Sequence, residues 1–96
     1  MTHLVLMKFQ EGYFTDACFD EINQAFVQLK QALPAEILDA NVYKNIITRN
    51  TNMDILIQLH LSRFESLDIY LNHPIHQAIG AKMNPYIITR VSFDYE

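Results

Sequence analysis

The chain has 96 residues, of which half are hydrophobic and 19% are charged, and its formal net charge is −4. This balance is typical of a folded globular domain and excludes a disordered chain, which lacks enough apolar residues to fold. The negative charge and the scattered Lys and Arg residues argue against nucleic acid or an anionic membrane as the main partner. With a lone Cys18, no signal peptide and no membrane-spanning run, we expect one cytoplasmic domain over residues 1–96.

The first half of the chain predicts strand, helix and strand. Residues 3–10 are apolar on both faces of an extended chain, which indicates a central strand. Residues 15–33 have apolar side chains three and four apart, which predicts a helix capped by Thr15 and ended by Pro34. Residues 37–47 alternate between apolar and polar side chains, so we expect a strand at an edge of the sheet.

The second half predicts the same three elements with an interrupted helix. Residues 53–61 show the clearest period of two and indicate a second central strand. Ser62-Arg63-Phe64-Glu65 matches a capping box, which predicts a helix from Ser62 onward. His73-Pro74 interrupts that helix, because Pro74 suits the first position of a new segment with His73 as its cap. The new segment ends at Asn84-Pro85, and residues 86–95 predict the last strand.

The order β-α-β-β-α-β predicts an α+β fold of the ferredoxin-like kind, with an antiparallel four-stranded sheet and helices on one face. The opposite face is then apolar enough that it should not meet water. Two sheets packed face to face would cover it, so we expect a homodimer formed through the sheet face. The residues expected on that face are Leu4, Leu6, Tyr43, Leu56 and Ile88, mixed with Lys8, Gln58 and Arg90.

Three stretches resemble the stress-responsive α/β-barrel (Dabb) family. They are the opening residues 3–9 (HLVLMKF), the Y-x-x-H-P-x-H-Q segment at residues 70–77, and the closing Asp94-Tyr95-Glu96. The resemblance spans the chain and implies a dimeric α+β barrel in a family whose members mostly have no established activity, some plant members being stress-linked.

One plant member of the family that the chain resembles is a polyketide cyclase. The resemblance implies acid–base roles for the positions of Tyr70 and His76 and a pocket position for His3. That cyclase has a further pocket His in its third strand, where this chain has Ile55, so the chain departs from the cyclase pattern there.

The residues themselves also predict a site between the sheet and the helices. His3 shares a strand face with Val5 and Met7, and His73 lies three residues before His76, so their side chains can project to one side of a helix. Imidazole titrates near neutrality and can move a proton. We therefore expect a pocket for a small hydrophobic or aromatic molecule, with Tyr70 and His76 as candidate catalytic residues and His3, Val5, Met7, Ile55 and His73 lining it.

Each of these side chains also has a purely structural interpretation. His73 suits a helix cap, His3 and His76 suit hydrogen-bonded packing positions, and Tyr70 suits the core. Three His residues could bind a metal ion, but no Cys or acidic ligand joins them, so we expect neither a metal nor another cofactor. Three functions stay open: a ligand-binding dimer, an enzyme with a cyclase-like or lyase-like reaction that uses Tyr70 and His76, and a structural dimer.

Overall fold

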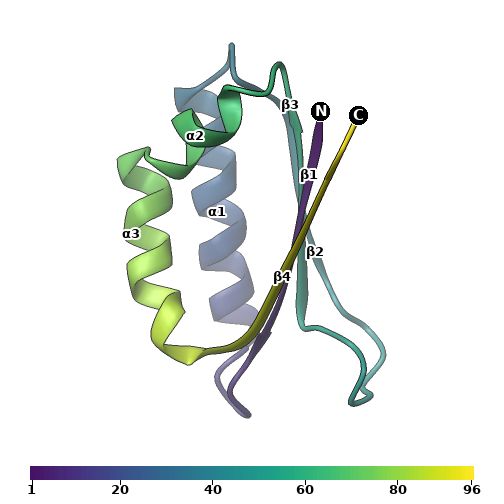
Figure 1. The fold of residues 1–96 in the computed structure, drawn as a ribbon. Coiled ribbons are helices and arrows are strands. Elements are labelled where there is room, and N and C mark those ends of the chain that lie inside the picture. Colours follow the sequence, from purple (N-terminus) through teal and green to yellow (C-terminus); the bar gives the residue numbers. More distant parts are fainter.

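The computed structural model describes residues 1–96 and has the ferredoxin-like α+β order that the sequence predicts. Figure 1 shows its helices on one side of a sheet, with the two ends of the chain close together at one end of that sheet. None of the helices has the length and apolar character needed to span a membrane. The elements are β1 (Thr2–Phe9), α1 (Asp16–Ala32), β2 (Ile37–Lys44), β3 (Ile55–Leu61), α2 (Ser66–Leu71), α3 (Pro74–Met83), the 3₁₀ helix η1 (Asn84–Tyr86) and β4 (Ile87–Tyr95).

The four strands are antiparallel in the order β2-β3-β1-β4, so β1 and β3 are central, as their apolar character predicts. The side chains of β1 and β3 that face the helices form the core with the apolar stripe of α1. Full burial of one such aliphatic or aromatic side chain contributes about 1.5–3 kcal/mol. The most deeply buried apolar side chains are Ile22, Leu29, Ile37, Leu59 and Leu61.

The long helix α1 begins and ends where its sequence predicts. The Thr15 hydroxyl accepts a hydrogen bond from the Cys18 amide at 3.2 Å, which satisfies one of the free donors of the first turn. At the other end the Leu33 amide donates to the Leu29 carbonyl, and Pro34 follows. The helix therefore lies in a fixed register over the sheet, with Ile22 and Phe26 directed at the site described below.

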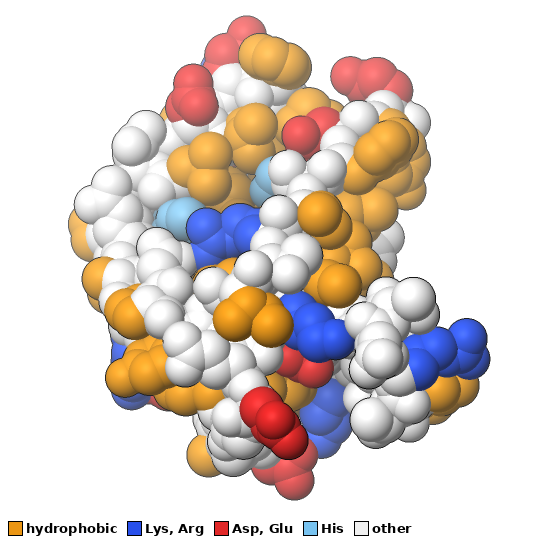
Figure 2. Space-filling view, turned by 60° about the horizontal axis from the view of Figure 1, so that its bottom comes forward, with side chains coloured by type: hydrophobic (Ala, Val, Ile, Leu, Met, Phe, Trp, Pro, Cys, Tyr) orange, Lys and Arg blue, Asp and Glu red, His pale blue; other side chains and the backbone are white.

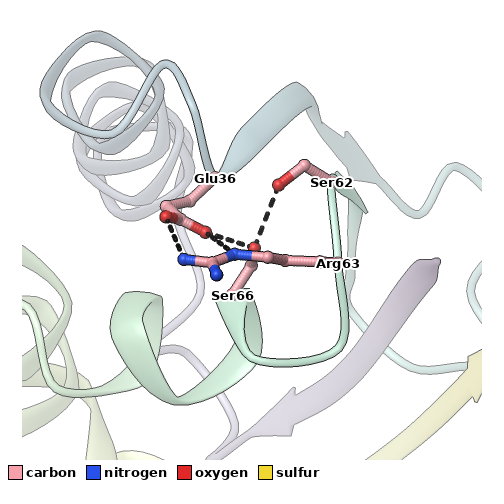
Figure 3. A network of polar contacts seen from close by, with 4 residues as sticks. All are labelled: Glu36, Ser62, Arg63 and Ser66. Carbon is pink, nitrogen blue, oxygen red and sulfur yellow. Dashed lines mark hydrogen bonds and ion pairs between the residues drawn. The ribbon is translucent and has the colours of Figure 1, made fainter.

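The predicted capping box at Ser62 is wrong, because α2 begins four residues later, at Ser66, and Glu65 makes no side-chain cap. Glu36, at the start of β2, accepts hydrogen bonds from the Ser66 hydroxyl and from the Arg63 guanidinium (Figure 3). The Ser62 amide donates to the Glu36 carbonyl at 3.0 Å. A residue distant in sequence thus holds residues 62–65 as a turn, and this cluster fixes the start of α2 against the sheet.

The loop between β2 and β3 is longer than the sequence predicts. The strands end at Lys44 and resume at Ile55, whereas we expected them to reach residue 47 and to resume at residue 53. Asp54 explains the late start of β3, because its carboxylate accepts the Phe9 amide at 2.8 Å and so ends the β1 ladder. Side-chain amides of Asn45 and Asn52 bind the Ile47 carbonyl within the loop, in place of strand pairing.

The faces of β4 are reversed relative to the prediction. A β-bulge shifts the β1–β4 register, so that Lys8 pairs with Thr89 and Phe9 pairs with Ile87, leaving Ile88 as the extra residue. Beyond the bulge, Arg90 lies opposite Met7, on the face that the helices cover. Our placement of Arg90 on the open face was therefore wrong, and the apolar side chains that occupy the open face of β4 are Val91, Phe93 and Tyr95.

Candidate functional site

A cavity of about 340 Å³ lies between the sheet and the helices, within the usual range of small-molecule sites. Most of its wall is apolar: Val5, Met7, Ile22, Phe26, Ile57, Leu67, Leu71, Ile79, Met83 and Ile87. Its polar side chains are His3, Tyr70, His76, Asn84, Arg90, Ser92 and Asp94. Figure 2 shows one face of the molecule on which His and Lys or Arg side chains lie next to one another among hydrophobic ones.

His3 and Asp94 form a pair at one end of the cavity. They lie directly opposite each other in the β1–β4 ladder, and the His3 Nδ1 contacts the Asp94 carboxylate. A carboxylate only accepts hydrogen bonds, so the hydrogen of a neutral His3 ring sits on Nδ1. The His3 Nε2 is then an acceptor, on a ring that is buried.

Tyr70 and His76 form a second pair, brought together by the break at Pro74. Tyr70 lies in α2 and His76 in α3, and their ring centroids are 4.7 Å apart in an edge-to-face arrangement. The His76 Nδ1 donates to the Leu71 carbonyl at 3.0 Å, because a carbonyl can only accept. This bond leaves the His76 Nε2 as the free acceptor of the ring.

The protonation states of this second pair follow from burial. Burial lowers the pKa of His76, and the charge of Arg90 and the nearby His3 lower it further, against the opposing effect of the bond to the Leu71 carbonyl. Burial also raises the pKa of Tyr70, whose side chain is 2% exposed. At neutral pH the pair therefore presents a neutral imidazole acceptor and a phenolic hydroxyl donor.

The structure brings together five of the seven residues that the sequence predicts for the site. The five that line the cavity are His3, Val5, Met7, Tyr70 and His76. Ile55 and His73, which we also expected there, are not part of its wall.

The positions of Ile55 and His73 have separate causes. Ile55 is buried opposite Met7 in the β1–β3 ladder, and Ile57, two residues further along the strand, reaches the cavity instead. The His73 ring is used as the cap of α3, where its Nδ1 accepts the Ile75 amide at 3.1 Å. No three His, Cys, Asp or Glu side chains lie close enough together to hold a metal ion.

Sequence reasoning missed the contribution of β4 to the site. Arg90, Ser92 and Asp94 alternate along the strand and all line the cavity. The alternation is visible in the sequence, but we placed Arg90 with Ile88 on the open face, which would put the intervening Val91 and Phe93 on the core side. An apolar strand face can pack against a second subunit as well as against the core of its own chain, and this alternative could have corrected the assignment of β4.

Comparison with known proteins decides the family. The model of the Stress responsive A/B Barrel Domain (Dabb) family matches residues 1–96. The chain belongs to the Dabb family. No curated protein sequence matches it.

Solved structures similar to this Dabb protein share its ferredoxin-like fold. A protein from Bacteroides fragilis has a TM-score of 0.83 and 20% identity, over 99% of this chain and 93% of that one, and is described as dimeric and of unknown function. A dimeric ferredoxin-like protein of unknown function from Thermobifida fusca has a TM-score of 0.70 and 22% identity, over 98% and 87%. A hydroxynitrile lyase from Passiflora edulis has a TM-score of 0.76 and 12% identity, over 98% and 89%.

Proposed function

We propose that this Dabb protein is a homodimer that binds a small, largely hydrophobic or aromatic molecule in the cavity between its sheet and its helices. The observation that carries the proposal is the cavity of about 340 Å³, whose wall is mostly apolar and has its polar side chains among the apolar ones. Such a cavity is the usual form of a small-molecule site, in which apolar surface supplies affinity and a few polar groups fix orientation.

The polar groups favour a ligand that carries oxygen. None of the side-chain hydrogen bonds of the chain uses the Tyr70 hydroxyl, although this side chain is nearly fully buried. The hydroxyl can therefore donate to a carbonyl or phenolate oxygen in the cavity, while the neighbouring His76 Nε2 can accept from a ligand hydroxyl. No side-chain nitrogen or oxygen of the chain is both fully buried and without a partner, so the Tyr70 oxygen is accessible from the cavity, where a ligand can take the place of water.

The open face of the sheet supports the dimer. Val91, Phe93 and Tyr95 of β4 are 49%, 64% and 46% exposed, beside the half-buried Leu4 and Leu6 of β1. Packing against a second sheet would remove this apolar surface from water. Two similar structures are described as dimeric, which supports a homodimer here.

A variant that fills the cavity tests the proposed binding. Ser92→Phe places an aromatic ring on the cavity wall, and Ser92→Ala changes the same position without filling it. Wild type and Ser92→Ala should bind members of a panel of small aromatic amides and phenols in ligand-observed NMR, and Ser92→Phe should not. The proposal fails if no member binds to wild type, or if binding persists in Ser92→Phe while that variant keeps the wild-type melting temperature.

A second candidate function is an enzyme that moves a proton, with His76 as the base and Tyr70 as the hydrogen-bond donor. The bond from the His76 Nδ1 to the Leu71 carbonyl supports it, because it fixes the tautomer whose Nε2 can take a proton. Tyr70 would stabilise the enolate oxygen that forms as the substrate loses its α-proton. Exchange of that proton for deuterium in an enolisable aryl ketone should then be faster with wild type than with His76→Gln. If a bound ketone exchanges its α-proton at the same rate with wild type and with His76→Gln, the enzymatic function is refuted and ligand binding remains as the proposed function.

A further inference from the structure

Arg90 is the one Lys or Arg side chain on the wall of the cavity. It reaches this position because the bulge at Ile88 turns it toward the helices, opposite Met7. Its Nη2 donates to the side-chain oxygen of Asn84, which is a neutral amide. None of the ion pairs of the chain includes Arg90, so its charge has no carboxylate in contact with it.

The nearest acidic residue on the same strand face does not neutralise Arg90. Asp94 lies four residues further along β4, which corresponds to about 13 Å in an extended strand. Its carboxylate is already engaged by the His3 Nδ1. The side chain between them on this face is the uncharged Ser92. Within the cavity, Arg90 therefore has no acidic partner, whereas Asp94 is already paired with His3.

We infer that the ligand of this cavity is an anion, a small aromatic or aliphatic molecule that carries a carboxylate held by Arg90. The inference rests on the proposed function and adds the chemical class of the ligand. A guanidinium matches a carboxylate with two parallel hydrogen bonds, and it does so best beside apolar surface that limits competition from water. Met7, Ile79 and Ile87 of the wall supply that surface for the body of the ligand.

The residues around Arg90 also suit a carboxylate. The bond from Arg90 to the Asn84 oxygen holds the guanidinium at the wall and leaves the Asn84 amide hydrogens free to donate. The Ser92 hydroxyl, next along the strand on the same face, is a further donor. Arg90 is exposed, so with a neutral ligand of the same shape its charge would stay solvated by water and would add nothing to the affinity. The position of Arg90 thus predicts discrimination by charge more than by shape.

Pairs of ligands that differ only in charge test the inference. Benzoate, 3-phenylpropanoate and 2-naphthoate are compared with the corresponding amides by calorimetry or ligand-observed NMR. Wild type should bind the carboxylates about tenfold more tightly, the low end of what charge-assisted hydrogen bonds give at a partly exposed site. Arg90→Gln should bind acid and amide equally, because it removes the positive charge that favours the carboxylate. Arg90→Lys should keep part of the preference for the carboxylate, because an ammonium group supplies the charge but not the two parallel hydrogen bonds of a guanidinium.

Arg49→Gln is the matched control, since Arg49 lies in the exposed loop between β2 and β3, away from the cavity. It removes the same charge and should leave the preference at its wild-type value. Amide binding without any preference for the carboxylate, or a preference that survives in Arg90→Gln, overturns the role of Arg90 while the proposed binding function stands. If neither acids nor amides bind to wild type, both the inference and the proposed function fail.

Discussion

Removing the Tyr70 hydroxyl tests whether this group serves the cavity or the fold. The Tyr70 ring is buried and packs against three other rings, with centroid distances of 5.8 Å to His3, 6.1 Å to Phe26 and 4.7 Å to His76. Tyr70→Phe keeps all of these contacts and removes only an oxygen that no hydrogen bond of the chain uses. Tyr70→Ala removes the ring as well and leaves a hole in the core.

The expected free energies of unfolding differ sharply between these two variants. Tyr70→Phe should change the free energy of unfolding by less than about 0.5 kcal/mol, since a structural hydrogen bond would be worth about 1 kcal/mol. Tyr70→Ala should lose about 3–5 kcal/mol, the usual range for truncation of a large buried aromatic ring. That loss is a large part of the total stability of a small domain, about 5–15 kcal/mol.

Urea denaturation at one fixed protein concentration measures these values, because the stability of a dimer depends on concentration. In the same samples, Tyr70→Phe should bind an aromatic ketone or acid more weakly, by about 2- to 12-fold for one lost hydrogen bond. A loss of stability above about 1.5 kcal/mol in Tyr70→Phe would assign the hydroxyl to the fold. Unchanged stability with unchanged affinity for every ligand that binds would refute its role in the cavity.

Two further predictions concern the dimer and the Glu36 cluster. Leu6→Asp puts a charge on the open face of β1 and should shift the mass in light scattering from that of a dimer to that of the 11.2 kDa monomer. The control Gln28→Asp puts the same charge on the exposed side of α1 and should stay dimeric. A monomeric wild type would contradict the dimer. Hydrogen bonds from Arg63 and Ser66 lower the pKa of Glu36, so the stability they add is present above the ordinary value of 4.5 and is lost as the pH falls through the lower, folded value. The melting temperature should therefore fall less between pH 5 and pH 3 in Glu36→Gln than in wild type, and equal losses in the two proteins would show that this linkage is absent.

The order of the elements could be predicted from the sequence because each element carries its own local signal. Thr15 and Pro34 mark the ends of α1, His73-Pro74 marks the start of α3, and the apolar density of residues 3–10 indicates a central strand. These signals depend on backbone chemistry within a few residues, so they hold whatever the rest of the chain does. The structure agrees with them to within about two residues, which is the usual uncertainty of helix and strand ends.

The features that could not be predicted depend on contacts between distant residues. The capping box at Ser62 fails because Glu36, in the turn before β2, accepts hydrogen bonds from Ser66 and Arg63. The faces of β4 reverse because one extra residue, Ile88, enters the ladder, and no local pattern marks a bulge at an isoleucine. This single shift conceals the part that Arg90 and Asp94 play in the cavity.

The site was partly predictable for the same reason. His3, Tyr70 and His76 lie in segments whose periodicity gives their direction, and all three line the cavity. The partner of His3 was not predictable, because the pairing with Asp94 depends on the register of two strands at opposite ends of the chain. We expected Ile55 at the cavity, but Ile57, two residues further along the same face of β3, lines it instead. Which of the two reaches the cavity depends on where the helices lie over the sheet.

The most direct test of a ligand-binding cavity is a crystal structure of the dimer grown with excess 2-naphthoate. Our account predicts electron density for the ligand between the sheet and the helices α2 and α3, with its carboxylate at Arg90 and its rings against the apolar wall. A cavity closed by its own side chains in the dimer, with no ligand inside, would contradict the account and leave the protein as a structural dimer.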